Sequence, residues 1–140
     1  MAESCTGGLV GARITDVAGA SQYFEGGVVA YSNKAKEVHL GITPDILRRD
    51  GAVSRTVAEA MAIGVARRFG VQVGVAVTGV AGPTGGSEEK PVGTVWIAVS
   101  LSGTIHAVHH RFEGSRVEIR ERSAEAVLAL VLTVVDGKRE

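Results

Sequence analysis

Three segments of the sequence carry side chains that could attack, protonate or hold a small polar substrate. The first is Ser4-Cys5-Thr6-Gly7-Gly8, which places two hydroxyls, a thiol and bare glycine backbone at the start of an expected helix. A helix N-terminus has unpaired N–H groups and a positive partial charge, so it can hold an anion or stabilise an oxyanion. Ser and Thr are also common helix caps, and a cap with close packing is the alternative interpretation.

The second segment runs from Tyr31 to Lys36, where an expected strand ends and a helix begins. Sheets of α/β proteins commonly place ligand contacts at such strand ends. A lysine acts as a general base only where burial or nearby positive charge lowers its pKa, and a phenol can then orient or relay the proton. Ser4 with Lys34 or Lys36 would form a serine–lysine pair. The alternative is that both lysines are solvated and Tyr31 belongs to the core.

The third segment is the loop of residues 79–93, which follows Thr78 and contains five glycines and two prolines. Its backbone N–H groups, near Gly79 and Gly82, could approach a phosphate. The loop matches neither the Walker A pattern nor G-x-G-x-x-G, so the signal is weak in isolation. Arg116 and Arg120 at the start of the last expected helix form a possible anion site, with solvated surface arginines as the alternative.

Other side chains that bind metals or act as nucleophiles give weaker signals. His106, His109 and His110 share one expected strand, whose alternation separates His109 from the other two, and no carboxylate stands at a convincing spacing. We therefore expect no metal site. Cys5, the single cysteine, excludes an intrachain disulfide and a multi-cysteine zinc site. It is an alternative nucleophile to Ser4, or a small buried side chain.

Composition limits the class of protein. The 140 residues are 45% hydrophobic and 21% charged, which fits one soluble globular domain. Fifteen basic and fifteen acidic side chains cancel, so charge gives no indication of nucleic-acid binding. The longest apolar run, residues 127–135, is about half of what a membrane-spanning helix needs. The start of the chain shows no secretory signal, so we expect a cytoplasmic protein with no membrane partner.

Periodicity and turn residues predict alternating helices and strands. Helices are expected at residues 6–18, 33–40, 44–50, 54–70 and 115–135, and strands at 23–32, 71–78, 94–100 and 105–112. The last two strands should form a hairpin around residues 101–103. This order predicts an α/β fold, as a single three-layer α/β/α domain with a mixed central sheet.

The sequence resembles the C-terminal domain of the CinA family, the nicotinamide-mononucleotide deamidases, in six segments that follow the family order. They are AESCTGG (2–8), TDVAGAS (15–21), FEGGVVAYSNKAK (24–36), DGAVS (50–54), VTGVAGPTGGSEEKPVGTVWIAV (77–99) and the F-x-G-x-R run at 112–116. These segments cover nearly the whole chain. Together they are far more specific than any single motif described above.

The resemblance implies hydrolysis of the carboxamide of nicotinamide mononucleotide to give nicotinic acid mononucleotide and ammonia. No metal or organic cofactor is required. The residues implied as catalytic are Ser4 as the nucleophile, Lys36 as its base and Tyr31 as the helper of that base. We expect the step to belong to pyridine nucleotide recycling.

The substrate contacts implied by the resemblance lie in the three segments. We expect the backbone N–H groups of Cys5, Thr6, Gly7 and Gly8 to hold the oxyanion. The nucleotide is expected to face the glycine-rich loop, and its phosphate to meet an arginine. The residues expected there are Thr78, Gly79 and Gly82, with Arg116 or Arg120.

The family pattern has a helix and a strand before the AESC motif, whereas this chain begins two residues ahead of Glu3. We therefore expect residues 1–140 to form a CinA C-terminal-like domain that lacks this helix and strand. A homo-oligomer is expected from base rates. The alternative function is a non-catalytic nucleotide-binding or regulatory module. Retention of Ser4, Tyr31 and Lys36 favours the enzyme, because a binding module has no use for a nucleophile paired with a base.

Overall fold

A mixed sheet forms the middle layer of the protein. The computed structural model describes residues 1–137, and its strands are β1 (Ala2–Glu3), β2 (Val28–Val29), β3 (Val73–Gly79), β4 (Thr94–Leu101) and β5 (Thr104–Arg111). The five strands follow the order β2-β1-β3-β4-β5. Strand β1 is parallel to β2 and β3, whereas β3, β4 and β5 are antiparallel neighbours.

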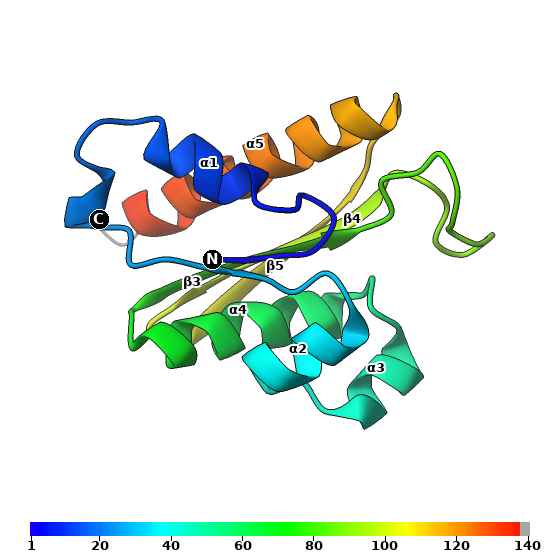
Figure 1. Ribbon diagram of the computed structural model, residues 1–140, viewed down its shortest axis with the longest axis horizontal. Coiled ribbons are helices and arrows are strands. Elements are labelled where there is room, and N and C mark those ends of the chain that lie inside the picture. The colour runs from blue at the N-terminus through cyan, green and yellow to red at the C-terminus, as the bar shows by residue number, and fades with distance from the viewer. Residues whose placement is uncertain (138–140) are drawn as a thin grey trace.

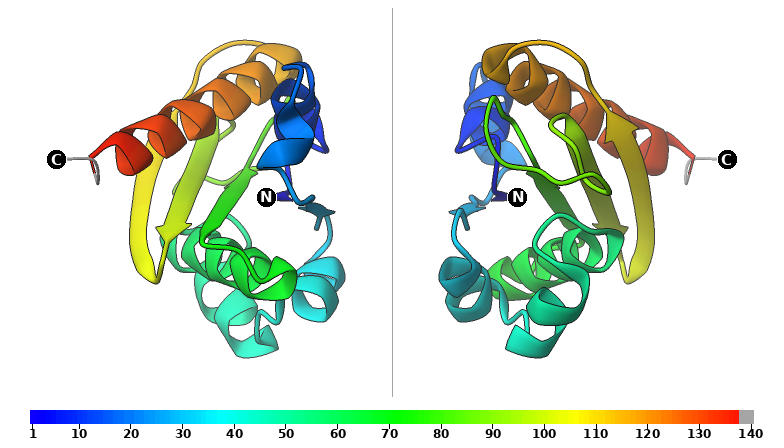
Figure 2. Two further views of the ribbon diagram at one scale, coloured as in Figure 1. Left: turned by 90° about the vertical axis from the view of Figure 1, so that its left-hand side faces the viewer. Right: turned by 90° about the vertical axis from the view of Figure 1, so that its right-hand side faces the viewer.

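Helices cover both faces of this sheet, which confirms the predicted three-layer α/β/α fold (Figures 1 and 2). Helices α1 (Leu9–Thr15) and α5 (Arg116–Asp136) lie on one face. Helices α2 (Asn33–Leu40), α3 (Pro44–Asp50) and α4 (Arg55–Phe69) lie on the other. A short 3₁₀ turn, Ala20–Gln22, follows α1. Within the described residues, no helix is long and apolar enough to cross a membrane.

Apolar clusters on the two faces of the sheet hold the three layers together. On the α4 face, Val57 and Met61 pack with Ala98 of β4, and all three are fully buried. On the α5 face, Ile119 and Val127 pack with buried residues of β3 and β4. The sheet is therefore covered on both faces, as the continuous apolar run of β3 predicts.

Short-range signals locate four of the five helix starts. Ser32, Thr43, Ser54 and Ser115 each accept a hydrogen bond from the backbone N–H three residues on, and so cap α2, α3, α4 and α5. Ser115 and Glu118 form a complete capping box. These ends match the predictions to within one or two residues, because the capping side chain and its helix are neighbours in sequence.

The first helix is shorter than the predicted 6–18. Gly7 and Gly8 have φ values of +60° and +108°, so the chain makes a turn there and α1 begins only at Leu9. Its N-cap residue, Gly8, has no side chain to cap the helix. The predicted caps, Ser4 and Thr6, lie upstream of this turn, and the buried carboxylate of Glu3 takes their place.

The predicted strand at 23–32 is reduced to Val28 and Val29. These two residues pair with Ala2 and Glu3, and β1 offers no longer edge. Gly26 has a φ of +147°, and its carbonyl accepts a hydrogen bond from the N-terminal ammonium of Met1. The aromatic and β-branched residues of the segment favour a strand, but the length of β2 is limited by its two-residue partner β1.

The ends of β1 and β3 position the residues whose side chains could take part in a reaction. The N–H of Ser4 donates to Val77 O at 3.0 Å, which continues the β1–β3 pairing one residue further. Ser4 therefore lies beside Thr78 of β3, near the carboxyl ends of two parallel strands. Such strand ends are a common place for ligand sites in α/β folds.

Candidate active site

A small cavity opens at the carboxyl ends of β1 and β3. Its volume is about 200 Å³, and we call it the polar cavity. The residues that line it are Ser4, Cys5, Tyr31, Lys36, Ala52, Val53, Thr78, Gly79, Ala81 and Arg116. Seven of these ten were predicted from the sequence as site residues, and the structure brings them together from segments far apart in the chain.

Lys36 reaches the cavity from the first turns of α2. Its side chain is only 1% exposed, although a lysine is almost never fully buried without a partner. The Nζ atom lies 3.1 Å from Ser4 Oγ, 2.9 Å from Ala30 O and 3.3 Å from Tyr31 O. Three polar contacts thus surround the nitrogen, and one of them is the candidate nucleophile.

Burial lowers the pKa of Lys36 below its ordinary value of 10.5. Removal from water disfavours the ammonium form, and the neighbouring Cys5 offsets this only in part. Within residues 1–137, no carboxylate lies close enough to Lys36 to form an ion pair that would restore the charge. A neutral amine beside a serine hydroxyl can act as a base.

Ser4 sits on a turn that two partly buried hydrogen bonds from Arg120 hold. It is 8% exposed. Arg120 donates from Nε to Cys5 O at 3.1 Å and from Nη2 to Thr6 O at 2.9 Å. These two donors fasten the turn to α5, so Arg120 lies behind the nucleophile and does not line the cavity.

Glu3 holds the turn from the other side. Its fully buried carboxylate accepts hydrogen bonds from the N–H groups of Gly8, Val10 and Gly11, at 3.2, 2.9 and 3.0 Å. The charge is placed at the positive end of α1, where a carboxylate is favourable. Ser4 therefore follows directly on a residue that cannot move without uncapping a helix. Nothing in the sequence pattern indicated this role for Glu3.

The predicted oxyanion donors divide into two pairs. The N–H of Gly7 donates to Ser4 O and that of Gly8 to Glu3 Oε1, so both are occupied and neither residue lines the cavity. Among the described residues, the N–H groups of Cys5 and Thr6 donate to no other residue. Of these two residues, Cys5 lines the cavity, whereas Thr6 is fully buried and does not. The N–H of Cys5 is thus the backbone donor of this turn that is placed to meet a substrate.

Tyr31 contacts Lys36 through its backbone carbonyl and not through its phenol. The hydroxyl accepts a hydrogen bond from Arg116 Nη2 at 3.0 Å, and the side chain is 58% exposed. Arg116 also donates from Nη1 to Gly82 O at 2.7 Å. Tyr31, Arg116 and Gly82 therefore form the outer rim of the cavity, where they could meet a group that extends from it.

Thr78 and Gly79 form the floor at the end of β3. The Thr78 hydroxyl is buried and donates to Ala52 O at 2.8 Å. A Cβ at Gly79 would come within 2.7 Å of Val95 and 3.2 Å of Cys5 Sγ, so only glycine fits there. Thr78 thus holds a wall of the cavity, and Gly79 keeps the floor open.

Sequence reasoning missed three lining residues, Ala52, Val53 and Ala81. Their side chains carry no chemistry, so no rule about nucleophiles, bases or anions selects them. The only signal was indirect: Ala52 and Val53 lie inside the DGAVS segment, and Ala81 inside the glycine-rich loop. Their side chains add apolar surface to the lining of the cavity.

Burial raises the pKa of the Cys5 thiol to about 11. The thiol therefore stays protonated at neutral pH, when it is a poor nucleophile. As regards metals, residues 1–137 contain no group of three His, Cys, Asp or Glu side chains that could hold an ion.

Comparison with known proteins agrees with this fold. The family model of the CinA C-terminal domain matches residues 1–135. A CinA-like protein of Gemmatimonas aurantiaca is 50% identical over 91% of this chain, and a competence-damage inducible protein of Moorella thermoacetica is 47% identical over 94%. The chain covers only 30% and 32% of these two relatives.

Solved structures of similar proteins have nearly the same fold. A competence/damage inducible protein of Agrobacterium tumefaciens superposes with a TM-score of 0.92 and 42% identity, over 94% of this chain and 81% of that one. A competence-damaged (CinA) superfamily protein of Escherichia coli has a TM-score of 0.92 at 32% identity, over 95% and 77% of the two chains. The similarity therefore extends through every layer of the fold.

Proposed function

Since the chain belongs to the CinA C-terminal domain family, we propose that it is an amidohydrolase that converts nicotinamide mononucleotide into nicotinic acid mononucleotide and ammonia. The observation that carries the proposal is the contact of 3.1 Å between Lys36 Nζ and Ser4 Oγ, both buried, in a cavity open to a small substrate. A serine and an unpaired buried lysine in contact form a nucleophile and its base.

The three contacts of Lys36 fit its neutral form. A neutral amine has two N–H groups and one lone pair. Ala30 O and Tyr31 O can accept only, so they take the two N–H groups. In this form the lone pair faces Ser4 and the Ser4 hydroxyl donates to Lys36, whereas the ammonium form donates to Ser4 Oγ instead. The backbone of the segment before α2 thus orients the base toward the nucleophile.

In the first half of the reaction, the Ser4 hydroxyl proton passes to Lys36 Nζ while Oγ bonds to the carboxamide carbon. The oxyanion that forms accepts a hydrogen bond from the free N–H group of Cys5. When the tetrahedral intermediate collapses, its carbon–nitrogen bond breaks. The leaving nitrogen takes the proton from Lys36 and departs as ammonia, and an ester to Ser4 remains.

In the second half, a water molecule attacks the ester carbon and gives its proton to Lys36. The carbon–oxygen bond to Ser4 then breaks, and Ser4 Oγ recovers the proton from Lys36. The products are the free serine, the neutral lysine and nicotinic acid mononucleotide. Lys36 therefore acts as base and as acid in alternation, which requires a pKa not far from the working pH.

The size of the cavity determines which part of the substrate it can enclose. Sites that enclose a drug-sized ligand measure about 300–1,000 Å³, whereas the polar cavity is about 200 Å³. It suits the nicotinamide ring, with Ala52, Val53 and Ala81 against the ring. The ribose and phosphate would lie at the rim, where Arg116 is exposed and charged. Arg120 is engaged behind the turn and is not assigned to the phosphate.

The test is ammonia release from nicotinamide mononucleotide by the parent, Ser4→Ala and Lys36→Met. Each substitution should lower kcat by about a thousandfold or more, because nucleophile and base act as one unit. Ser21→Ala, on an exposed serine outside the site, is the matched control and should keep full activity. In the parent, kcat/KM should rise with pH and level off below 10.5 as Lys36 loses its proton.

A measurement of stability checks the base without any substrate. The folded protein releases the Lys36 proton at a lower pH than the unfolded chain does. The free energy of unfolding should therefore rise with pH between these two pKa values in the parent, and this rise should be absent from Lys36→Met. The non-catalytic module would be favoured instead if the parent bound nicotinamide mononucleotide without turnover and Ser4→Ala and Lys36→Met bound it equally well.

A further inference from the structure

One wall of the polar cavity is a short connection without regular structure. It comprises residues 51–54, between the end of α3 and the start of α4, and we call it the wall segment. Ala52 and Val53 of this segment line the cavity. Their position depends on hydrogen bonds to the backbone around them, because no strand or helix fixes it.

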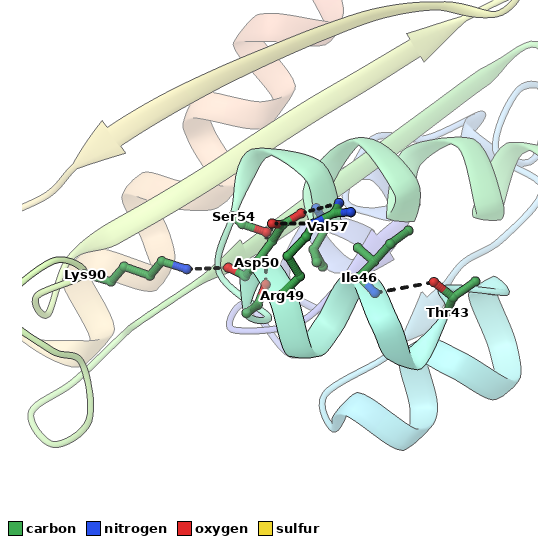
Figure 3. Close-up of polar contacts among 8 residues, drawn as sticks. Thr43, Ile46, Arg49, Asp50, Ser54, Val57 and Lys90 are labelled. Carbon is green, nitrogen blue, oxygen red and sulfur yellow. Dashed lines mark hydrogen bonds and ion pairs between the residues drawn. The ribbon is translucent and has the colours of Figure 1, made fainter.

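Three consecutive carbonyls at this wall each accept one side-chain hydrogen bond. Lys90 Nζ donates to Asp50 O at 2.6 Å, Ser54 Oγ to Gly51 O at 2.9 Å and Thr78 Oγ1 to Ala52 O at 2.8 Å. Ser54 is the cap of α4 at the end of the wall segment itself, and Thr78 belongs to strand β3. Lys90 alone of the three comes from the glycine-rich loop. Figure 3 shows it extending from that loop to Asp50.

The loop is shaped to present this lysine. Ser87 N donates to Lys90 O at 2.9 Å, and Lys90 N donates to Ser87 Oγ at 3.0 Å, which fixes the backbone of Lys90 in a tight turn. Gly86, with a φ of +80°, allows the turn, since a Cβ there would lie 2.9 Å from Lys90 O. At the other end, a Cβ at Gly51 would lie 3.1 Å from Lys90 Nζ. Glycine at both positions leaves room for the contact.

The same loop forms the facing side of the cavity. Gly79 and Ala81 line it, and Gly82 O accepts from Arg116. The loop is thus tied to the start of α5 by Arg116 and to the end of α3 by Lys90. Lys90 itself does not line the cavity, so it does not touch a substrate there.

We propose that Lys90 is a positioning residue for substrate binding, which holds the glycine-rich loop against the wall segment and thereby fixes the width of the polar cavity. The ammonium of Lys90 stabilises a carbonyl at the C-terminal end of α3, where a cation is favourable. Without this tie, Ala52 and Val53 can move away from Ala81, and the ring of the substrate loses its close packing. This inference rests on the proposed function for the identity of the substrate, but not for the position of the wall.

The experiment compares Lys90→Met, Lys90→Arg and the matched control Lys34→Met, whose lysine is exposed on α2. In Lys90→Met, KM for nicotinamide mononucleotide should rise about tenfold while kcat stays within about twofold, the size expected for losing one charged hydrogen bond. Lys90→Arg can still donate to Asp50 O and should recover most of the loss. Lys34→Met should match the parent.

Amide hydrogen exchange tests the same tie without substrate. Exchange at residues 51–54 and in the glycine-rich loop should become faster in Lys90→Met, and return in Lys90→Arg. Unchanged exchange together with unchanged KM would overturn the proposal, as would a loss confined to kcat. If the parent released no ammonia but the exchange pattern changed as described, the positioning role would stand and the proposed function would fail.

Discussion

Two cavities formed by the described residues lie at opposite ends of the parallel strand pair β1–β3, and they differ in size and chemistry. The polar cavity of about 200 Å³ lies where β1 and β3 end. A second cavity of about 800 Å³, the apolar groove, lies where these strands begin, between α1, α5 and the end of α4. Its lining includes Ile14, Val17, Phe69, Val131 and Leu132.

The residues that line the two cavities indicate that the smaller one is the candidate active site. No serine, cysteine or lysine is among the described residues that line the apolar groove. The polar cavity, four times smaller, contains a buried lysine in contact with a buried serine. Burial of a polar group costs free energy unless its hydrogen bonds are satisfied. A buried nucleophile with a base beside it therefore indicates function more strongly than an open volume does.

The two regions also differ in how their surroundings are built. Hydrogen bonds accepted by Glu3 and donated by Arg120, Thr78 and Lys90 brace the segments around the polar cavity. The apolar groove carries Val17, Tyr23 and Leu132 with exposures of 59%, 66% and 65%. Exposed apolar side chains therefore form part of its walls. This contrast predicts a strong response to substitution at one end of the sheet and a weak response at the other.

The largest effect outside the reacting pair is expected at Glu3. Glu3→Gln removes the charge from the N-terminus of α1 and leaves the amide NH₂ opposite one of three backbone donors. We expect a loss of about 2–4 kcal/mol in the free energy of unfolding, because buried donors lose a charged acceptor. Since Ser4 follows Glu3, kcat should also fall about tenfold as the nucleophile loses its position.

Chemical denaturation and ammonia release measure the two effects. Glu121→Gln, on an exposed glutamate of α5, is the matched control and should change the free energy of unfolding by no more than about 0.5 kcal/mol. An equal, small loss in both variants would show that the turn before α1 is held without the carboxylate. The buried carboxylate of Glu3 would then no longer count as evidence that the polar cavity is held more firmly than the apolar groove.

Some of the interactions that fix the fold and the polar cavity could be predicted from sequence, and others could not. The helix caps Ser32, Thr43, Ser54 and Ser115 were predictable, because each bonds to a backbone group three residues away. The role of Glu3 was not, because its bonds depend on two glycines that turn the chain back toward it. The length of β2 likewise depends on a partner strand of two residues.

The site shows the same division. Chemical type predicted Ser4 with Lys34 or Lys36, and the family resemblance implied Lys36. The structure places Lys36 in contact with Ser4. The phenol of Tyr31 was expected beside the lysine, yet it pairs with Arg116, 85 residues away in sequence. Long-range contacts of this kind have no local signature, so a pattern identifies which residues can react but not which ones orient them.

An intermediate effect is expected at Cys5, which lines the polar cavity next to Ser4. Its thiol is protonated at neutral pH, so Cys5→Ala should keep kcat within about threefold, whereas a nucleophilic cysteine would lose far more. The pKa of about 11 in the folded protein lies above the ordinary 9.0. The folded state therefore keeps a proton that the unfolded chain releases.

This difference gives a pH dependence with a definite sign. The stability contributed by the Cys5 thiol should be complete below pH 9 and should be lost as the pH rises to about 11. The unfolding free energies of the parent and Cys5→Ala should therefore converge over this interval, by about 2 kcal/mol. Denaturant titrations of both proteins at several pH values measure it. A constant difference would mean that the thiol is not buried.

The smallest effect is expected in the apolar groove. Leu132 lines it and is 65% exposed, so Leu132→Ser removes little buried surface and should change the free energy of unfolding by no more than about 0.5 kcal/mol. Val127, on the same helix but fully buried, is the matched comparison, and Val127→Ala should cost about 2 kcal/mol. KM and kcat for nicotinamide mononucleotide should be unchanged in Leu132→Ser, because the groove and the polar cavity lie at opposite ends of β3. A raised KM in this variant would connect the apolar groove to substrate binding. The lining residues would then not distinguish a functional cavity from a non-functional one.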